Sequence, residues 1–244
     1  MKIKVINPNT TLSMTAKIGE AAQSVAAVGT TVTAVSPRMG PASIEGHYDE
    51  AISAIGVLDE VRRGEEEGYD GYLIACFDDP GLLAAREIAR GPVVGIAEAA
   101  MHTASYISGG FSIVATLHRS RIILEHLARV YGMDHKCRKV RTTKVAVLDL
   151  EVEGSSAQSV IFDECRRAID EDGSDCIVLG CAGMADLVAA IQKEVSVPVI
   201  DGVTAGIKVL EGLIGLGVST SRAGGYAHPL PKEYSGDMAR FQPK

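Results

Sequence analysis

A short apolar strand that ends in a cysteine occurs twice in the chain, and this duplication constrains the fold more than any other feature. The copies are Asp70–Cys76 and Asp175–Cys181, with the Asp six positions before the cysteine in both. A helix-like segment follows each copy, and then an apolar strand that opens at Pro92 or at Pro198. The repeat predicts two similar half-molecules, each holding a thiol at the carboxyl end of a parallel strand, where open α/β sheets bind ligands.

Strand-like and helix-like segments alternate along the whole chain, which predicts an α/β protein with parallel sheets covered on both faces. We expect two similar subdomains, formed by residues 1–97 with 202–244 and by residues 98–201, and an active site in the cleft between them. Asp79 and Pro80 suit the N-cap and first position of the helix after Cys76. The other expected strands span residues 2–6, 31–35, 111–115 and 144–148. The other expected helices are one that follows the turn at residues 7–10 and ends at about residue 27, and those over 49–67, 98–107, 119–131, 156–170 and 203–216.

Charge and hydropathy exclude several classes of partner. The formal net charge is −7 and no concentrated basic block occurs, so we expect no nucleic-acid partner. No apolar run approaches membrane-spanning length and no signal-peptide pattern is present, so we expect a cytoplasmic protein that does not enter the membrane. Five cysteines at irregular spacing predict free thiols rather than disulfides, and without zinc-ligand spacing we expect no metal.

Two facing thiols suit one kind of chemistry. A thiolate is a good base, and its pKa is lowered at the start of a helix. Both Cys76 and Cys181 precede expected helix starts, although the carboxylates of Asp78 and Asp79 oppose ionisation of Cys76. Two bases on opposite faces of a flat carbon acid invert a stereocentre, because one removes a proton and the other delivers one. Backbone N–H groups after each cysteine are candidates to stabilise the enolate.

A purely structural interpretation competes with the catalytic one. A cysteine that closes a core strand usually serves packing, but the matched pair favours a shared function. Cys137, Cys165 and Cys176 lack a repeat partner, and the six histidines show no ligand spacing. Asn residues after the first strand are also routine turn formers, and Thr116 is equally suited to an N-cap.

Four motifs in order resemble hydantoin racemase, a family of the aspartate/glutamate racemase superfamily that is close to allantoin racemase. They are Ile6–Thr10 (INPNT), Ser43–Gly46 (SIEG), Cys76–Gly81 (CFDDPG) and Gly180–Met184 (GCAGM). The resemblance covers essentially the whole chain. It implies two Rossmann-like domains related by pseudo-twofold symmetry, racemisation without a cofactor, and a homo-oligomer, with a tetramer favoured.

Carried over, the resemblance makes Cys76 and Cys181 the acid/base pair. The residues that it offers for holding the hydantoin ring are Asn9, Ser43, Phe77, Asp78, Thr116, Ala182 and Gly183. We therefore expect a racemase of 5-substituted hydantoins, with allantoin as the nearest alternative substrate. Aspartate or glutamate is disfavoured because the loops around both cysteines contain no Lys or Arg. Two alternatives of other classes are a non-catalytic two-domain binding protein and a thiol-redox sensor.

Overall fold

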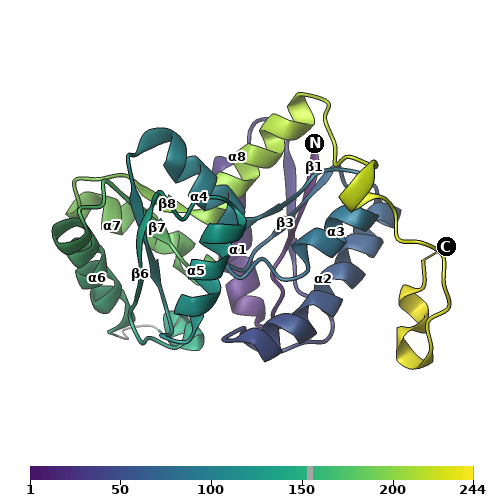
Figure 1. Ribbon diagram of the computed structural model, residues 1–244, viewed down its shortest axis with the longest axis horizontal. Coiled ribbons are helices and arrows are strands. Elements are labelled where there is room, and N and C mark those ends of the chain that lie inside the picture. Colours follow the sequence, from purple (N-terminus) through teal and green to yellow (C-terminus); the bar gives the residue numbers. More distant parts are fainter. Residues whose placement is uncertain (153–155, 244) are drawn as a thin grey trace.

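The computed structural model describes residues 1–152 and 156–243, and it consists of two α/β halves (Figure 1). Each half contains a parallel four-stranded sheet, with strand order β2-β1-β3-β4 in the first half and β6-β5-β7-β8 in the second. The predicted α/β class and the two similar subdomains are confirmed. The strands are β1 (Lys2–Ile6), β2 (Thr31–Val35), β3 (Gly71–Ile74), β4 (Val93–Gly95), β5 (Phe111–Ala115), β6 (Cys137–Thr142), β7 (Cys176–Leu179) and β8 (Val199–Asp201).

The two halves repeat one register. Ile6 of β1 pairs with Ile74 of β3, and Val114 of β5 pairs with Leu179 of β7. The central strands β3 and β7 are buried along their whole length, which explains their continuous apolar sequences. Because each central strand ends shortly before a cysteine of the repeat, both thiols emerge at the carboxyl edge of a sheet.

Helices cover both sheets and fill the space between them. The helices are α1 (Leu12–Val25), α2 (His47–Glu67), α3 (Leu82–Ile88), α4 (Ile96–Ile107), α5 (Ser120–Val130), α6 (Ala157–Asp172), α7 (Val188–Glu194) and α8 (Gly202–Gly215). An outer apolar cluster joins α2 and α3 to the first sheet, and another joins α6 and α7 to the second. A third cluster runs through both halves and includes residues of α1, α4, α5 and α8, so one continuous core connects them.

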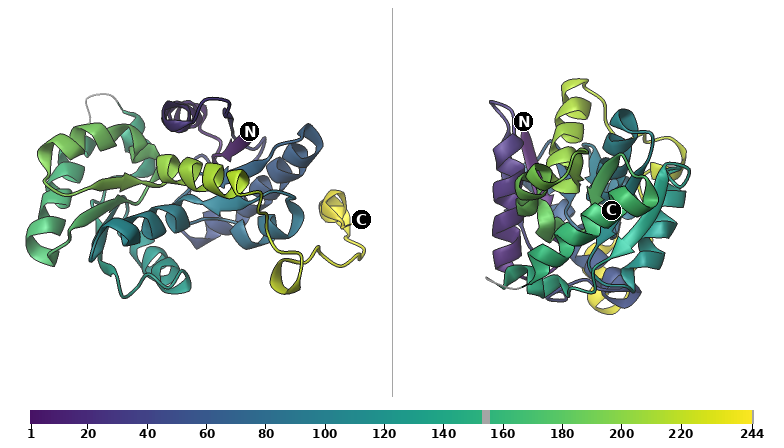
Figure 2. Two further views of the ribbon diagram at one scale, coloured as in Figure 1. Left: turned by 90° about the horizontal axis from the view of Figure 1, so that it is seen from above. Right: turned by 90° about the vertical axis from the view of Figure 1, so that its left-hand side faces the viewer.

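Helices α4 and α8 form the joint between the halves, and Figure 2 shows α8 lying across the middle of the molecule. Each follows directly on the edge strand of one sheet. Their N-terminal ends approach so closely that a methyl group on Gly202 would overlap the backbone of Ile96. Glycine is therefore required at this crossing. The division into residues 1–97 with 202–244 and 98–201 stays a prediction.

Two local predictions were wrong. The strand predicted over residues 144–148 is absent there; the edge strand is β6, and residues Val147–Glu151 form a 3₁₀ turn, η1. The apolar pattern did not predict β6, because its sequence is charged. Its Arg141 is nevertheless buried, since it is paired with Asp172 at 2.5 Å and with Glu164 at 2.9 Å on α6. Asp79 does not cap α3 and Pro80 is not its first residue, because α3 begins at Leu82 and its N-cap is Gly81.

The segment after α8 contacts the surface of the first half. Arg222 pins it by donating hydrogen bonds to the carbonyl oxygens of Arg86 and Glu87, 2.9 and 3.0 Å away at the end of α3. Its last 3₁₀ turn, η4 (Gly236–Phe241), lies beside α2, where Arg62 contacts the Phe241 ring. In the described parts of the chain, no helix is long and apolar enough to cross a membrane.

Candidate active site

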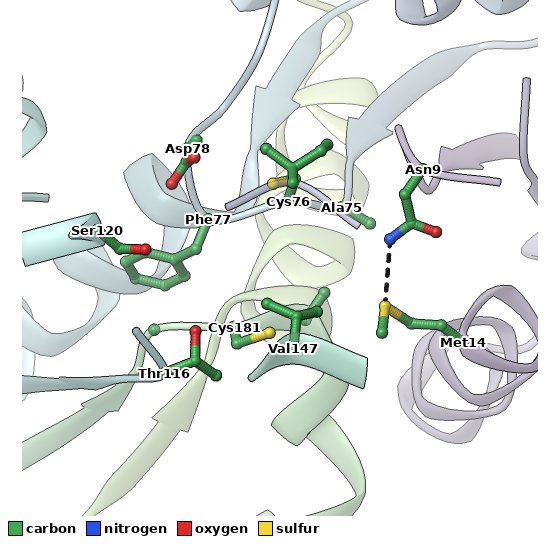
Figure 3. A pocket seen from close by; sticks show the side chains of 13 residues that line it. Asn9, Met14, Ala75, Cys76, Phe77, Asp78, Thr116, Ser120, Val147 and Cys181 are labelled. Carbon is green, nitrogen blue, oxygen red and sulfur yellow. Dashed lines mark hydrogen bonds between the residues drawn. The ribbon is translucent and has the colours of Figure 1, made fainter. Parts of the chain in front are cut away.

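A small pocket lies where the carboxyl edges of the two sheets meet, with Cys76 on one side and Cys181 on the other (Figure 3). Its cavity volume is about 30 Å³, which is room for about two water molecules at ~10–15 Å³ each. Both halves supply its walls. The lining residues are Asn9, Met14, Ile44, Ala75, Cys76, Phe77, Asp78, Thr116, Ser120, Val147, Gly180, Cys181 and Ala182.

Most residues singled out from the sequence meet at this pocket. Both cysteines line it, together with Asn9, Phe77, Asp78, Thr116 and Ala182. Ser43 and Gly183 lie next to lining residues without lining the pocket themselves. The Ser43 hydroxyl donates to Glu45 at 3.2 Å, and the backbone of Gly183 forms a hydrogen bond with the Cys181 thiol.

Burial opposes ionisation of Cys76. It raises the pKa of this thiol well above its ordinary value, and the nearby Asp78 carboxylate raises it further. A hydrogen bond from the Asp78 backbone acts in the opposite direction, because it favours the thiolate. Cys181 also raises the pKa of Cys76, since two thiolates in one pocket would repel each other. The pocket therefore favours at most one thiolate at a time.

Cys181 lies in a milder environment. Burial raises the pKa of its thiol to about 11, while the hydrogen bond from the Gly183 backbone lowers it. The charges of Asp78 and Glu151 add smaller increases. Two of the backbone groups after the cysteines, those of Asp78 and Gly183, thus form hydrogen bonds with the two sulfur atoms.

Asn9 is a donor held in a fixed orientation. Its Oδ1 accepts hydrogen bonds from Asn7 Nδ2 and from the Thr11 amide, both at 2.9 Å. Its Nδ2 is thereby directed to the pocket side, where it meets Met14 Sδ at 3.3 Å (Figure 3). A thioether sulfur is a weak acceptor, so a substrate oxygen that reaches this amide would be the better partner.

Asp78 and the apolar lining residues define the remaining walls. The Asp78 carboxyl is buried, and its pKa is raised to about 7 by burial first, and then by the charges of Glu50 and Asp79. Sequence reasoning missed several lining residues: Met14, Ile44, Ala75, Ser120, Val147 and Gly180. Ala75 and Gly180 directly precede the cysteines and Ile44 lies inside the SIEG motif, so these three had a signal. Val147 had none, because only the course of the chain after β6 brings it to the pocket.

This arrangement can exchange protons on two faces of a small, flat molecule. The two thiols come from different halves and lie on opposite sides of one pocket (Figure 3). Hydroxyl, amide and carboxyl groups surround them, whereas none of the described lining residues is a Lys or Arg. In the described residues, no group of three or more His, Cys, Asp or Glu side chains is arranged to hold a metal ion.

Comparison with known proteins gives consistent results. The family model Asp/Glu/Hydantoin racemase matches residues 3–210. A hydantoin racemase of Pseudomonas sp. (strain NS671) is 49% identical over 241 residues, covering 99% of this chain and 97% of the relative. Another from Rhizobium meliloti is 50% identical, covering 97% and 98%. The structure of an allantoin racemase from Klebsiella pneumoniae superposes with a TM-score of 0.97, at 52% identity and with complete coverage of both chains.

Proposed function

The chain belongs to the Asp/Glu/hydantoin racemase family, and from this premise we propose that it interconverts the D and L forms of 5-substituted hydantoins without a cofactor. Family membership supports racemase activity, which makes the protein an isomerase. The finer proposal depends on one observation. The two thiols of the duplicated strand ends lie on opposite sides of a single pocket.

The proposed reaction has two proton transfers. One cysteine, as thiolate, takes the proton from C5 of the bound hydantoin, and the electron pair moves to the adjacent C4 carbonyl to form an enolate. The thiol of the other cysteine then donates its proton to C5 from the opposite face. The product leaves with inverted configuration, and proton exchange with solvent restores the enzyme. Either cysteine acts as base, depending on the enantiomer bound.

The polar lining residues are suited to hold the ring. We assign the fixed Asn9 amide to a carbonyl oxygen, where it would stabilise enolate charge as it develops. Thr116 and Asp78 have side-chain oxygens that can accept the ring N–H groups. Phe77 and Ala182 contribute the apolar faces beside the thiols, and Ser43 and Gly183 support them from behind.

Pocket chemistry narrows the substrate class. Aspartate and glutamate carry carboxylates that need cationic partners, and no described lining residue supplies one. A hydantoin carries its polarity in amide groups, which the hydroxyl, amide and carboxyl side chains match. Ile44 from the loop before α2 and Val147 from η1 lie at the walls, so we assign to them contact with the C5 substituent. The likeness to an allantoin racemase keeps allantoin as a second candidate substrate.

Substrate binding requires these walls to move. A cavity of about 30 Å³ does not hold a five-membered ring with two carbonyl groups. Ile44 belongs to the first half and Val147 to the second, so a separation of the halves would open the pocket between them. Closure over the substrate would then exclude water and bring both thiols to C5.

The test is polarimetry in D₂O with reduced protein and no added cofactor, using L-5-benzylhydantoin and (S)-allantoin. We expect optical rotation to decay to zero, with one deuterium gained at C5 in the inverted product. The ratio of the two rates identifies the preferred substrate. The matched control is Cys165→Ser, which alters a buried thiol outside the pocket and is expected to retain the activity.

Failure would point to one of the other classes. Ligand binding without rotation decay or deuterium gain, for both compounds at mildly alkaline pH, would contradict the racemase proposal and favour a binding protein. A Cys76–Cys181 disulfide formed by mild oxidation, detected by mass spectrometry together with absent turnover, would favour a redox sensor.

A further inference from the structure

Asp79, three positions after Cys76, forms hydrogen bonds with parts of the molecule outside its own turn. Its side chain is buried, yet it lies outside the pocket lining and does not cap the helix that follows it. Its backbone has φ +46°, in the left-handed region. A residue with a Cβ occupies that region at a cost in free energy, so surrounding contacts have to hold it there.

The contacts of Asp79 lead to a different helix. Its Oδ1 accepts the Ala97 amide at 3.1 Å, and its Oδ2 accepts the Glu98 amide at 3.0 Å. The carboxylate thus satisfies the first free N–H groups of α4, the helix at the joint between the halves. Gly95 leaves the necessary space, because a methyl group there would overlap the carboxylate.

A third bond to Asp79 comes from the second half. The hydroxyl of Tyr131, the residue after α5, donates to Asp79 Oδ2 at 2.8 Å. Asp79 also closes the turn that carries Cys76, since its amide donates to the Cys76 carbonyl oxygen at 3.0 Å. One residue therefore connects the Cys76 turn, the start of α4 and the other half of the molecule.

In the second half, the corresponding helix α8 is capped without a residue from the thiol turn. Helix α8 is capped by Asp201, the last residue of β8, whose Oδ1 accepts the amides of Val203 and Thr204, both at 2.9 Å. The equivalent position before α4 is Gly95. The residue three positions after Cys181, which corresponds to Asp79, is Met184, and its side chain cannot accept hydrogen bonds from a helix start as a carboxylate does. Only in the first half, therefore, does a residue of the thiol turn cap the helix that follows the edge strand.

We propose that Asp79 is a positioning residue for Cys76, which fixes the thiol turn to α4 and, through Tyr131, to the closed arrangement of the two halves. This inference rests on the proposed racemase function for its kinetic consequence. Its structural consequence does not depend on that function. Burial raises the pKa of Asp79 to about 7 while its three hydrogen bonds favour the carboxylate, so the bonded form gains population as pH rises through neutrality.

The variants that test this are Asp79→Asn, Tyr131→Phe and the matched control Asp201→Asn. Asn keeps the shape of the side chain but places an N–H group against a donor of α4 or of Tyr131. We expect Asp79→Asn to lower kcat about tenfold to a hundredfold with little change in KM, the size of effect that a small misplacement of a reacting group produces. Tyr131→Phe, which leaves the cap intact, is expected to lower kcat by less. Asp201→Asn makes the same change from carboxylate to amide at the start of α8, where one oxygen that Asn retains accepts both amides, and it is expected to keep kcat within about twofold of wild type.

A second readout is independent of turnover. Iodoacetamide alkylation, quantified by mass spectrometry for each cysteine, reports the accessibility and ionisation of each thiol. We expect the Cys76 to Cys181 labelling ratio to rise in Asp79→Asn and Tyr131→Phe, because the Cys76 turn is released and, in the first variant, a repelling charge is lost. The ratio should stay at the wild-type value in Asp201→Asn.

The two proposals fail in different ways. Wild-type protein that does not racemise either hydantoin would contradict the proposed function, while the labelling ratio would still test the role of Asp79. Wild-type racemisation, with Asp79→Asn and Tyr131→Phe both unchanged in kcat and in labelling ratio, would overturn the positioning role. If Asp79→Asn does not fold, Tyr131→Phe decides on both readouts.

Discussion

The two thiol turns begin from equivalent strand ends and then differ in almost every residue. Cys76-Phe-Asp-Asp is bulky and acidic, whereas Cys181-Ala-Gly-Met is small and neutral. The first turn extends a carboxylate to α4 and to Tyr131. The second runs directly into the 3₁₀ turn η2 (Ala182–Leu187), where the Gly183 backbone lies against its own thiol. The duplicated fold places two sulfur atoms, and the turns give them different surroundings.

This difference has an electrostatic consequence. Both thiols have a raised pKa because both are buried. For Cys76 the next largest cause is the charge of Asp78, which raises the pKa further, whereas for Cys181 it is the Gly183 backbone hydrogen bond, which lowers the pKa. In a two-base racemase each thiol has to act both as acid and as base, so the proposed mechanism does not require one thiol to be the stronger base. The asymmetry instead decides which cysteine loses its proton first as the pH rises. We infer that Cys181 is the more readily ionised of the pair.

The largest expected effect breaks the pair itself. Cys76→Ser or Cys181→Ser should lower the racemisation kcat by about 10²–10⁴-fold, the usual contribution of a positioned acid or base. The hydroxyl of serine is too weak an acid to replace a thiol in this role. Cys137→Ser, outside the pocket, is the control measured by the same polarimetric assay. Equal activity of all three variants would contradict any two-thiol mechanism.

The next effect compares the first strand of each half. Asn9 follows β1 and Thr116 follows β5, and both line the pocket. Asn9→Leu removes an amide that two hydrogen bonds hold in place, and we expect kcat to fall by about 10²–10³-fold, as for loss of one oxyanion donor. Thr116→Val keeps the side-chain shape and should cost less. A larger loss of kcat in Thr116→Val than in Asn9→Leu would indicate that Thr116, in the second half, contacts the enolate oxygen instead.

The smallest effect sharpens the electrostatic difference between the turns. Asp78→Asn removes a negative charge that raises the pKa of both thiols, so both should ionise at lower pH than in wild type, and Cys76 should shift more. Because the pKa of Asp78 itself is about 7, the repulsion is present only above neutral pH. The measurement is the pH dependence of iodoacetamide labelling for each cysteine. Asp163→Asn, an exposed carboxylate on α6, is the control, and an upward shift of Cys76 would contradict the account.

Local sequence patterns predicted the elements whose burial is simple. Apolar runs identified β3 and β7, which are buried along their whole length, and helical spacing identified α5, whose buried residues are apolar. The same spacing identified α2, although most residues that this helix buries are small or polar: Ser53, Gly56, Val57, Glu60, Val61 and Gly64. The pattern failed for β6, where Arg141 is buried against carboxylates of α6 and the strand reads as solvent-exposed. A charge neutralised by a residue distant in sequence leaves no local signal.

For the site as well, the sequence indicated the residues that are close together in the chain but not the contacts between distant segments. The repeat located both thiols, and the turn residues beside them followed from adjacency. Val147 and the Tyr131–Asp79 bond depend on how the halves pack against each other, which a one-dimensional pattern does not contain. Asp79 illustrates the limit most clearly. Its type and position suggested a cap for the next helix, and its actual partner is α4, where Gly95 makes room for it.

The central claim is that the two thiols act on opposite faces of one carbon, and deuterium exchange of single enantiomers tests it most directly. Cys76→Ser and Cys181→Ser are each incubated in D₂O with the D and the L hydantoin separately, and C5 deuterium is measured before inversion. We predict that each variant exchanges only one enantiomer, without inverting it, and that the two variants select opposite enantiomers. Exchange of the same enantiomer by both variants, or of both enantiomers by either, would contradict the account.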